Sequence, residues 1–150
     1  MLKKILIGLL VVLVVIQFFP VKKNNGGSQA HTIGTAYPVP ENVAIILKKS
    51  CYDCHSNTTT YPWYSRIQPV GWWLNHHVDE GKEHLNFSEF TSYPAKKQAH
   101  KLEEVAETVD HNEMPLNSYL WIHTDARLTP QEKQTLMSWA SQLQHQIELQ

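Results

Sequence analysis

The feature that most constrains this chain is a long apolar run at its N-terminus. The sequence is apolar from Ile5 to Phe19 except for Gly8 and Gln17. The run lacks the polar face that a helix on a water-soluble core normally shows. A helix from Leu2 to Val21 would extend roughly 30 Å, which is the thickness of a bilayer's hydrocarbon core. The run therefore predicts a membrane helix and divides the chain into an anchor and a soluble part.

Residues 1–23 are predicted to be an uncleaved anchor. A cleaved signal peptide needs small residues just beyond the apolar run, whereas this run ends in the sequence FFPVKK. The nearest suitable pattern, Ser28-Gln29-Ala30, lies about ten residues too far downstream. Lysine pairs flank both ends of the run, so charge alone does not set its orientation. The very short N-terminal tail favours an N-terminus inside and an exported remainder.

The remainder is predicted to be a tether followed by one domain. Residues 24–40 read NNGGSQAHTIGTAYPVP, a composition typical of a flexible linker. Residues 41–150 are enough for a single domain. Of the 13 Lys and Arg, four lie in the anchor, so nine face all 14 Asp and Glu, a formal charge of −5 with neutral His. A domain of this charge argues against nucleic acid as a partner.

Four segments with helical spacing of apolar residues, and none that alternates like a strand, predict an all-α domain. The expected helices run from Glu41 to about Cys51, from Pro69 to about His84, from just after Pro94 through Val109, and from Thr129 onward. The last has the clearest start signal, because Thr129, Pro130 and Glu132 supply an N-cap, a proline at N1 and a capping box.

The chain's two cysteines, Cys51 and Cys54, are followed directly by His55 in the sequence SCYDCHSN. Four sites are compatible with this motif: a redox dithiol, a zinc site, a disulfide and a c-type haem attachment. A dithiol needs a strand–helix–strand context, and structural zinc usually needs a second closely spaced pair; the sequence shows neither. A disulfide would leave His55 unexplained, whereas haem attachment uses all three residues.

Haem attachment also accounts for the spacing and agrees with the predicted export. Two thiols about one helical turn apart can add to the vinyl groups on one edge of a porphyrin, and the next imidazole can reach the iron. This attachment takes place on the non-cytoplasmic side of a membrane. The sequence therefore predicts one covalent haem c, held by Cys51 and Cys54, with His55 as the proximal iron ligand.

Met114 is the expected second axial ligand. Among the other methionines, Met1 starts the chain and Met137 lies within the last predicted helix. Met114 stands in the irregular segment NEMPLNSY, where Pro115 keeps the backbone out of a helix. The alternative distal ligand is His77, which could instead contact a haem propionate. Thioether ligation would raise the reduction potential relative to imidazole ligation.

Longer motifs resemble a known family. The sequences CHSN, YPWYS, HVDEG, LNFS and MPL resemble the small bacterial haem-binding domain family, which is cytochrome c-like and often membrane-tethered. The resemblance covers residues 41–140 and implies covalent haem at Cys51 and Cys54, ligation by His55 and a role for Met114. Lys82 stands where the family would have arginine, a change that matters if this position binds a propionate with two hydrogen bonds.

Aromatic residues near the motif are candidates for the wall of the haem pocket. Trp63 and Trp73, together with Tyr61, Tyr64 and Trp72, offer enough apolar surface to cover a porphyrin. Arg66 could pair with a propionate. In a domain this small the haem would itself be part of the core, so packing and cofactor binding overlap.

These features predict a membrane-anchored monohaem c-type cytochrome with an all-α, cytochrome c-like fold. It would cross the bacterial inner membrane once, with its soluble domain on the periplasmic side. It would exchange single electrons with a redox partner protein rather than catalyse a reaction. The main alternative is a haem sensor or peroxidase-like protein with an open or displaceable sixth iron position and His76 or His77 as distal group. A zinc or disulfide module without haem is a third possibility.

Overall fold

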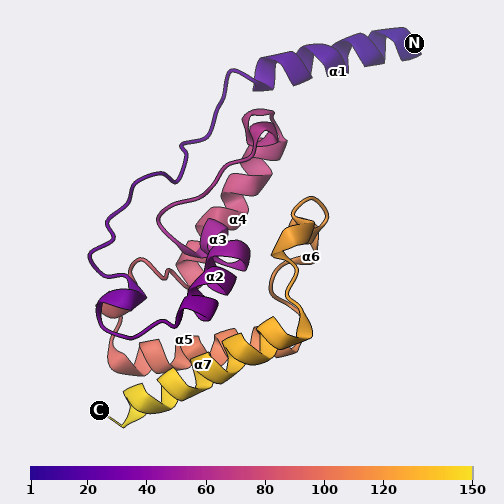
Figure 1. Cartoon of the computed structure of the whole chain (residues 1–150). Coiled ribbons are helices and arrows are strands. Elements are labelled where there is room, and N and C mark those ends of the chain that lie inside the picture. The colour runs from indigo at the N-terminus through magenta and orange to yellow at the C-terminus, as the bar shows by residue number, and fades with distance from the viewer. Residues whose placement is uncertain (150) are drawn as a thin grey trace.

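The computed structural model describes residues 1–149 and is all-α, as predicted (Figure 1). The only strand-like pairing in the described residues is an isolated bridge between Asn25 and Thr58. The seven α-helices are α1 (Leu2–Ile16), α2 (Glu41–Ser50), α3 (Tyr52–His55), α4 (Val70–His84), α5 (Ala95–Asp110), α6 (Asn117–Leu120) and α7 (Pro130–Glu148). Four 3-10 helices join them: η1 (Ile33–Thr35), η2 (Trp63–Arg66), η3 (Phe90–Ser92) and η4 (Thr124–Ala126).

The helices α2, α4, α5 and α7 occupy the four predicted segments. The predicted capping box at the start of α7 is present: the hydroxyl of Thr129 accepts the Glu132 N–H at 3.2 Å, and the Glu132 carboxylate accepts the Thr129 N–H at 2.8 Å. Lys49 of α2 also donates to Glu132, at 2.5 Å. The hydrogen bond from Lys49, followed by that from the Thr129 backbone, lowers the pKa of Glu132. This contact joins α2 to the first turn of α7.

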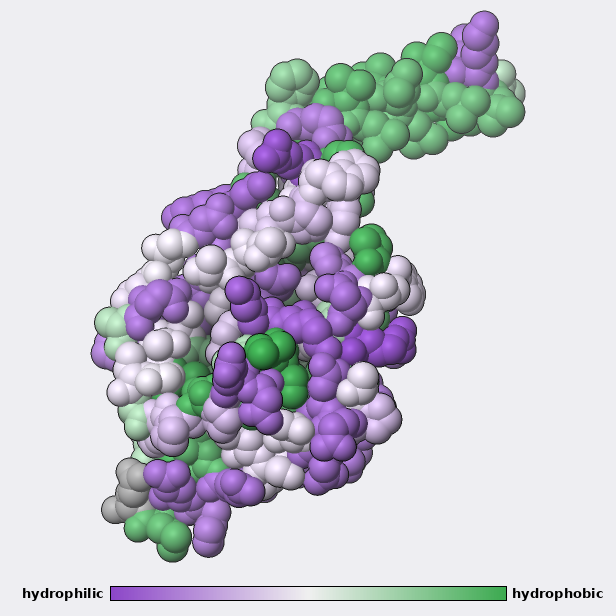
Figure 2. All heavy atoms as spheres, in the orientation of Figure 1, coloured by the Kyte–Doolittle hydropathy of each residue, from purple (hydrophilic) through white to green (hydrophobic). Residues whose placement is uncertain are grey.

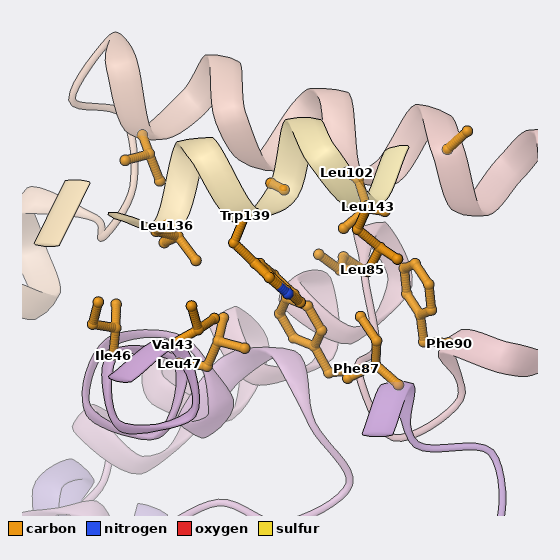
Figure 3. Packing of buried hydrophobic residues seen from close by; sticks show 14 of the residues in the cluster. Val43, Ile46, Leu47, Leu85, Phe87, Phe90, Leu102, Leu136, Trp139 and Leu143 are labelled. Carbon is orange, nitrogen blue, oxygen red and sulfur yellow. The ribbon is translucent and has the colours of Figure 1, made fainter. Parts of the chain in front are cut away.

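The core lies where α5 and α7 run side by side and cover α2 (Figures 1 and 3). The three helices bury their apolar faces against one another, with Trp139 of α7 reaching between them. The segment after α4 completes this core. Among the core residues are Val43, Ile46 and Leu47 from α2, Leu102 from α5, Leu136 and Leu143 from α7, and Leu85, Phe87 and Phe90 from the segment after α4.

Residues 24–40 pack along the domain, although their composition predicts a flexible tether. Ile33 is 1% exposed and belongs to the core, and its N–H donates to the Phe87 carbonyl at 3.0 Å. Near the start of the segment, the Asn24 amide donates to the Ser56 carbonyl at 2.8 Å and to the Thr59 hydroxyl at 2.9 Å. One buried apolar side chain and paired backbone groups therefore hold a segment that is otherwise rich in Gly and Asn.

The helix α1 ends at Ile16, earlier than the predicted limit of Val21. Pro20 disfavours helical geometry in the residue before it, so the chain leaves the helix ahead of the proline. The side chain of Gln17 forms two hydrogen bonds with the Gln68 backbone, at 2.9 and 3.0 Å, and ties this end to the domain. Among the helices of residues 1–149, none combines the length and apolar character required to cross a membrane.

Candidate cofactor site

The cysteine motif lies where α2 ends and α3 begins. Cys51 caps α2 by donating its N–H to the Leu47 carbonyl at 2.9 Å, and its own carbonyl accepts the His55 N–H at 2.9 Å. The intervening single turn, α3, places the two thiols one helical turn apart. Both thiols are free, and burial, with a smaller effect of Cys54, raises the pKa of Cys51 to about 12. Burial, followed by the charge of Asp53, raises the pKa of Cys54 to about 11, so both sulfurs are protonated at neutral pH.

The imidazole of His55 is oriented by the backbone that follows α4. Its Nδ1 lies 3.0 Å from the Leu85 carbonyl oxygen. A carbonyl only accepts, so Nδ1 carries the proton and Nε2 keeps a free lone pair. Burial lowers the pKa of His55, which favours the neutral ring. A backbone carbonyl on one ring nitrogen with the other nitrogen free is the usual arrangement of a metal-ligating histidine.

Gly81 allows α4 to lie directly against the cysteine motif. A Cβ at this position would stand 2.7 Å from the Cys54 carbonyl oxygen and 3.0 Å from the Cys54 Cβ. No larger residue fits without moving one of the two helices. The close approach also brings the Leu85 carbonyl, one turn further on, to His55. The glycine of the HVDEG sequence therefore has a packing role that the sequence analysis did not identify.

The loop after His55 is held by a network of buried polar side chains. The side-chain amide of Asn86 donates to the Oδ1 of Asn57 at 2.8 Å, and the Nδ2 of Asn57 donates to the Glu89 carboxylate at 2.7 Å. Its backbone N–H donates to the Ser88 hydroxyl at 3.1 Å. Asn57, Asn86 and Ser88 are all buried. This network joins the CHSN sequence, which forms the motif loop, to the LNFS sequence, which supports that loop.

Met114 is carried by a loop that turns back from the end of α5. Asn112 adopts a left-handed backbone with φ of 61°, a conformation that asparagine tolerates better than most residues. The N–H groups of Glu113 and Met114 then both donate to the Thr108 carbonyl, at 2.9 and 3.2 Å. Met114 is half-buried there. The irregular segment predicted around Met114 is thus a defined turn.

These segments enclose a cavity of about 500 Å³, within the range of about 300–1,000 Å³ typical of cofactor pockets. Cys51, Cys54, His55 and Met114 all line it, as does the alternative ligand His77. The rest of the wall is largely apolar, with Leu85, Phe87, Val105, Val109, Leu116 and Leu136 among its members. Neutral thiols, an imidazole with a free nitrogen and a thioether on one apolar cavity fit a covalently bound haem.

Tyr119 links the Met114 segment to the cysteine motif, a contact that the sequence did not predict. Its hydroxyl donates to the carboxylate of Asp53 at 2.9 Å, and Asp53 lies between the two cysteines. Burial and then the charge of Asp53 raise the pKa of Tyr119, so the hydroxyl stays protonated and donates. The Tyr119 ring also stacks on His123 at 4.2 Å between ring centroids. Both Tyr119 and Asp53 line the cavity.

Three predicted cofactor contacts, Trp63, Trp73 and Arg66, do not line the cavity. Trp63 is 75% exposed and Trp73 is 45% exposed, while Arg66 is exposed in η2. The three residues stand at or near the start of α4, whereas the cysteine motif meets the other end of this helix at Gly81. Their closeness to the cysteine motif in the sequence did not indicate that these residues lie outside the cavity lining.

The charged residues of the cavity also differ from those predicted. Lys82 lies outside the cavity lining and donates to the Asn24 side chain at 2.8 Å, so it ties α4 to residues 24–40. Within the described part of the chain, Lys101 is the one Lys or Arg that lines the cavity, and it pairs with Glu104 at 2.6 Å. Nothing in the sequence marks Lys101, since a lysine on a helix is usually a solvated surface residue.

His77 lines the cavity with a buried Nδ1 that has no hydrogen-bond partner within residues 1–149. The nearest carboxylate oxygen, of Glu80, lies 3.5 Å away. The ring of Trp73 packs on the His77 ring at 4.4 Å between centroids. A buried polar atom without a partner is costly and indicates a group that is satisfied by something else.

The zinc alternative has no ligand set in the described residues. Residues 1–149 contain no group of three or more His, Cys, Asp or Glu side chains arranged to hold a metal ion. His55 and Met114, facing one largely apolar cavity, suit haem iron better than zinc, because zinc is rarely bound by a thioether.

Comparison with known proteins agrees with the site. No curated protein and no solved structure matches the chain. A family model, that of the haem-binding domain, matches residues 11–142. This match includes the cysteine motif, all of α2 to α6 and most of α7. The resemblance noted from the CHSN, HVDEG and MPL sequences is confirmed, and the chain belongs to the haem-binding domain family.

Proposed function

We propose that this chain is a membrane-tethered monohaem c-type cytochrome with a cytochrome c-like fold, which transfers single electrons. The observation that carries the proposal is that Cys51, Cys54, His55 and Met114 line one cavity. A bound haem would supply an iron that accepts and releases one electron.

The cysteines and the histidine would attach and orient the cofactor. The two thiols would hold the porphyrin through thioether bonds, one to each vinyl group, with no net oxidation or reduction. The Nε2 of His55 would bind the iron, and the Leu85 carbonyl, 3.0 Å from Nδ1, fixes the orientation of the ring. The contact of Gly81 with Cys54 keeps the attachment turn in place.

Met114 would provide the second iron ligand from the protein. Its loop is fixed at the α5 end by the Thr108 carbonyl and beyond Pro115 by the hydrogen bond from Tyr119 to Asp53. Two fixed ligands and an apolar wall limit the rearrangement that accompanies electron transfer. A thioether ligand would also favour the reduced iron relative to a second imidazole. Lys101 is the side chain placed to meet a propionate, in competition with Glu104.

The apolar run at residues 2–21 would hold the protein in the bacterial inner membrane, with the haem domain on the periplasmic side. Two features support this part of the proposal. No residue of α1 is buried, and all of its apolar side chains except that of Ile16 are exposed. Covalent haem attachment through C-x-x-C-H takes place outside the cytoplasm, which agrees with an exported domain. The partner would be another redox protein.

A second function is favoured by the unpartnered Nδ1 of His77. If the Met114 thioether does not bind iron or is easily displaced, His77 would lie beside an open sixth position. The protein would then bind a small ligand such as CO or a peroxide at the iron, as a haem sensor or a peroxidase-like protein.

Absorption spectroscopy separates the two functions. Haem that stays with the chain after denaturation, and is lost in a Cys51→Ala, Cys54→Ala double variant, would support covalent attachment. A charge-transfer band at the red end of the ferric spectrum, lost in Met114→Ala and kept in His77→Ala, would support thioether ligation. Rapid CO binding by the reduced wild type would instead favour the open site. No haem retained by the denatured wild type would contradict the cytochrome proposal.

A further inference from the structure

The domain exposes a group of large apolar side chains at one end. Most of its exposed large apolar residues belong to two segments, the stretch from η2 to the start of α4 and the loop after α6. A hydrogen bond of 2.6 Å between the Tyr64 hydroxyl and His123 Nε2 holds these segments together. We call this group the tryptophan face; it comprises Trp63, Ile67, Trp72, Trp73, Trp121 and Ile122.

The exposure of this face is unusual for tryptophan. Trp63 and Trp121 are 75% and 80% exposed, and Trp72 and Trp73 are 36% and 45% exposed. The fifth tryptophan, Trp139, is 8% exposed in the core. Large apolar side chains exposed on two linked segments indicate an interaction site, and tryptophan is enriched where proteins meet the headgroup level of a bilayer.

The tryptophan face is continuous with the end of α1. The indole N–H of Trp72 donates to the Phe19 carbonyl at 2.8 Å, and Gln17 is hydrogen-bonded to the Gln68 backbone. Phe18 and Phe19, which are 78% and 63% exposed, extend the apolar surface from α1 toward the face. In Figure 2, α1 projects from this end of the molecule as an almost wholly apolar rod.

The charges around the face complement an anionic lipid surface. The domain as a whole is acidic, yet the sequence from Tyr61 to Val78 contains no Asp or Glu and does contain Arg66. In the loop after α6, the one acidic residue, Asp125, is balanced by Arg127. Lys22 and Lys23 follow Phe19 closely, and no acidic residue precedes Glu41. Basic side chains beside exposed tryptophans are the composition of interfacial membrane-binding surfaces.

We propose that the tryptophan face rests in the headgroup region of the same bilayer that holds α1, and that anionic lipids strengthen this contact. The inference rests on the membrane tethering proposed above. It adds that the haem domain lies on the lipid surface in one orientation. α5 and α7, at the end of the domain farthest from α1, stay clear of the contact (Figure 1).

The test uses the full chain with its haem, labelled with 5-fluorotryptophan and reconstituted into vesicles of phosphatidylcholine and phosphatidylglycerol. A fraction of the lipids carries a gadolinium chelate on the headgroup, and ¹⁹F NMR is recorded on the reduced protein. Single Trp→Phe variants assign the resonances. We expect the resonances of Trp63, Trp72, Trp73 and Trp121 to broaden several-fold, and that of the buried Trp139 to serve as the internal control.

Flotation of the vesicles separates the two proposals. If the protein floats with the vesicles but the four resonances broaden no more than that of Trp139, tethering stands and the lipid contact is overturned. If the protein does not float, the tether and the lipid contact fail together, while the haem proposal is unaffected. If the four tryptophan resonances do not broaden and light scattering gives the mass of a dimer, the tryptophan face binds a second copy of this chain. That result also overturns the lipid contact.

Discussion

Replacing Gly81 with alanine should weaken the contact between α4 and the cysteine motif. The added Cβ would stand 2.7 Å from the Cys54 carbonyl oxygen, whereas ordinary van der Waals contact begins at 3.4 Å. The obstacle is backbone, not the end of a flexible side chain, so the two helices must separate by about 0.7 Å, the difference between these distances. The same movement draws the Leu85 carbonyl away from His55.

The change in the free energy of unfolding caused by Gly81→Ala is the sum of two opposing effects. Overpacking of a tight contact costs about 1–3 kcal/mol. Alanine in place of glycine inside a helix recovers about 0.8–1.0 kcal/mol. We therefore expect Gly81→Ala to lower the free energy of unfolding by about 1 kcal/mol, which is about a fivefold change in the folding equilibrium and about 4 °C in Tm.

Thermal denaturation of the haem-loaded protein, followed by far-UV circular dichroism, measures this loss. Gly34→Ala is the matched control, because a Cβ at Gly34 meets nothing within 4 Å. The control should keep the wild-type Tm, while Gly81→Ala should also alter the haem absorption spectrum through His55. A Gly81→Ala protein with wild-type Tm and spectrum would refute the reasoning, since it would show that the two helices separate without cost.

Three further substitutions test other contacts of the site and the fold. Tyr119→Phe removes the hydrogen bond to Asp53 and should lower the free energy of unfolding, measured in urea, by about 1.5–3 kcal/mol. It should also weaken the thioether charge-transfer band, and an unchanged band would show that Tyr119 does not position the Met114 loop. Asn57→Ala leaves the buried Asn86 amide without its acceptor and should cost about 1–3 kcal/mol, seen as a lower urea midpoint at unchanged slope. Thr129→Ala removes the capping box and should cost about 1 kcal/mol, whereas Thr129→Ser should restore most of it; equal losses in both would exclude capping as the cause.

Local signals in the sequence were sufficient to place most helices. Proline at the start of α5 and α7, and the capping residues Thr129 and Glu132, define helix ends within one turn of chain. The cysteine motif likewise forms the single helical turn, α3, that its spacing led us to expect. These predictions succeeded because the determining residues are neighbours in the sequence.

Contacts between distant segments were not predictable in the same way. Ile33 is a single apolar residue among Gly, Asn and Thr, and composition gave no sign that it enters the core. Trp63 and Trp73 were expected at the cofactor because they are aromatic residues near the cysteine motif, yet neither lines the cavity; Trp73 packs instead on His77, which does. The partners of Gly81 and Tyr119 lie 27 and 66 residues away in the sequence, at Cys54 and Asp53, and periodicity contains no information about such pairs.

The packing of residues 24–40 has a consequence for the electron transfer proposed above. A free tether of this length would let the domain move by roughly 20–25 Å relative to the end of the anchor. With Ile33 in the core and Asn24 bonded to Ser56 and Thr59, that freedom is absent. On a membrane, the iron would be kept at one fixed distance from the lipid surface. Because electron-tunnelling rates fall steeply with distance, only redox partners whose own centres lie at a similar distance from the membrane could exchange electrons with it.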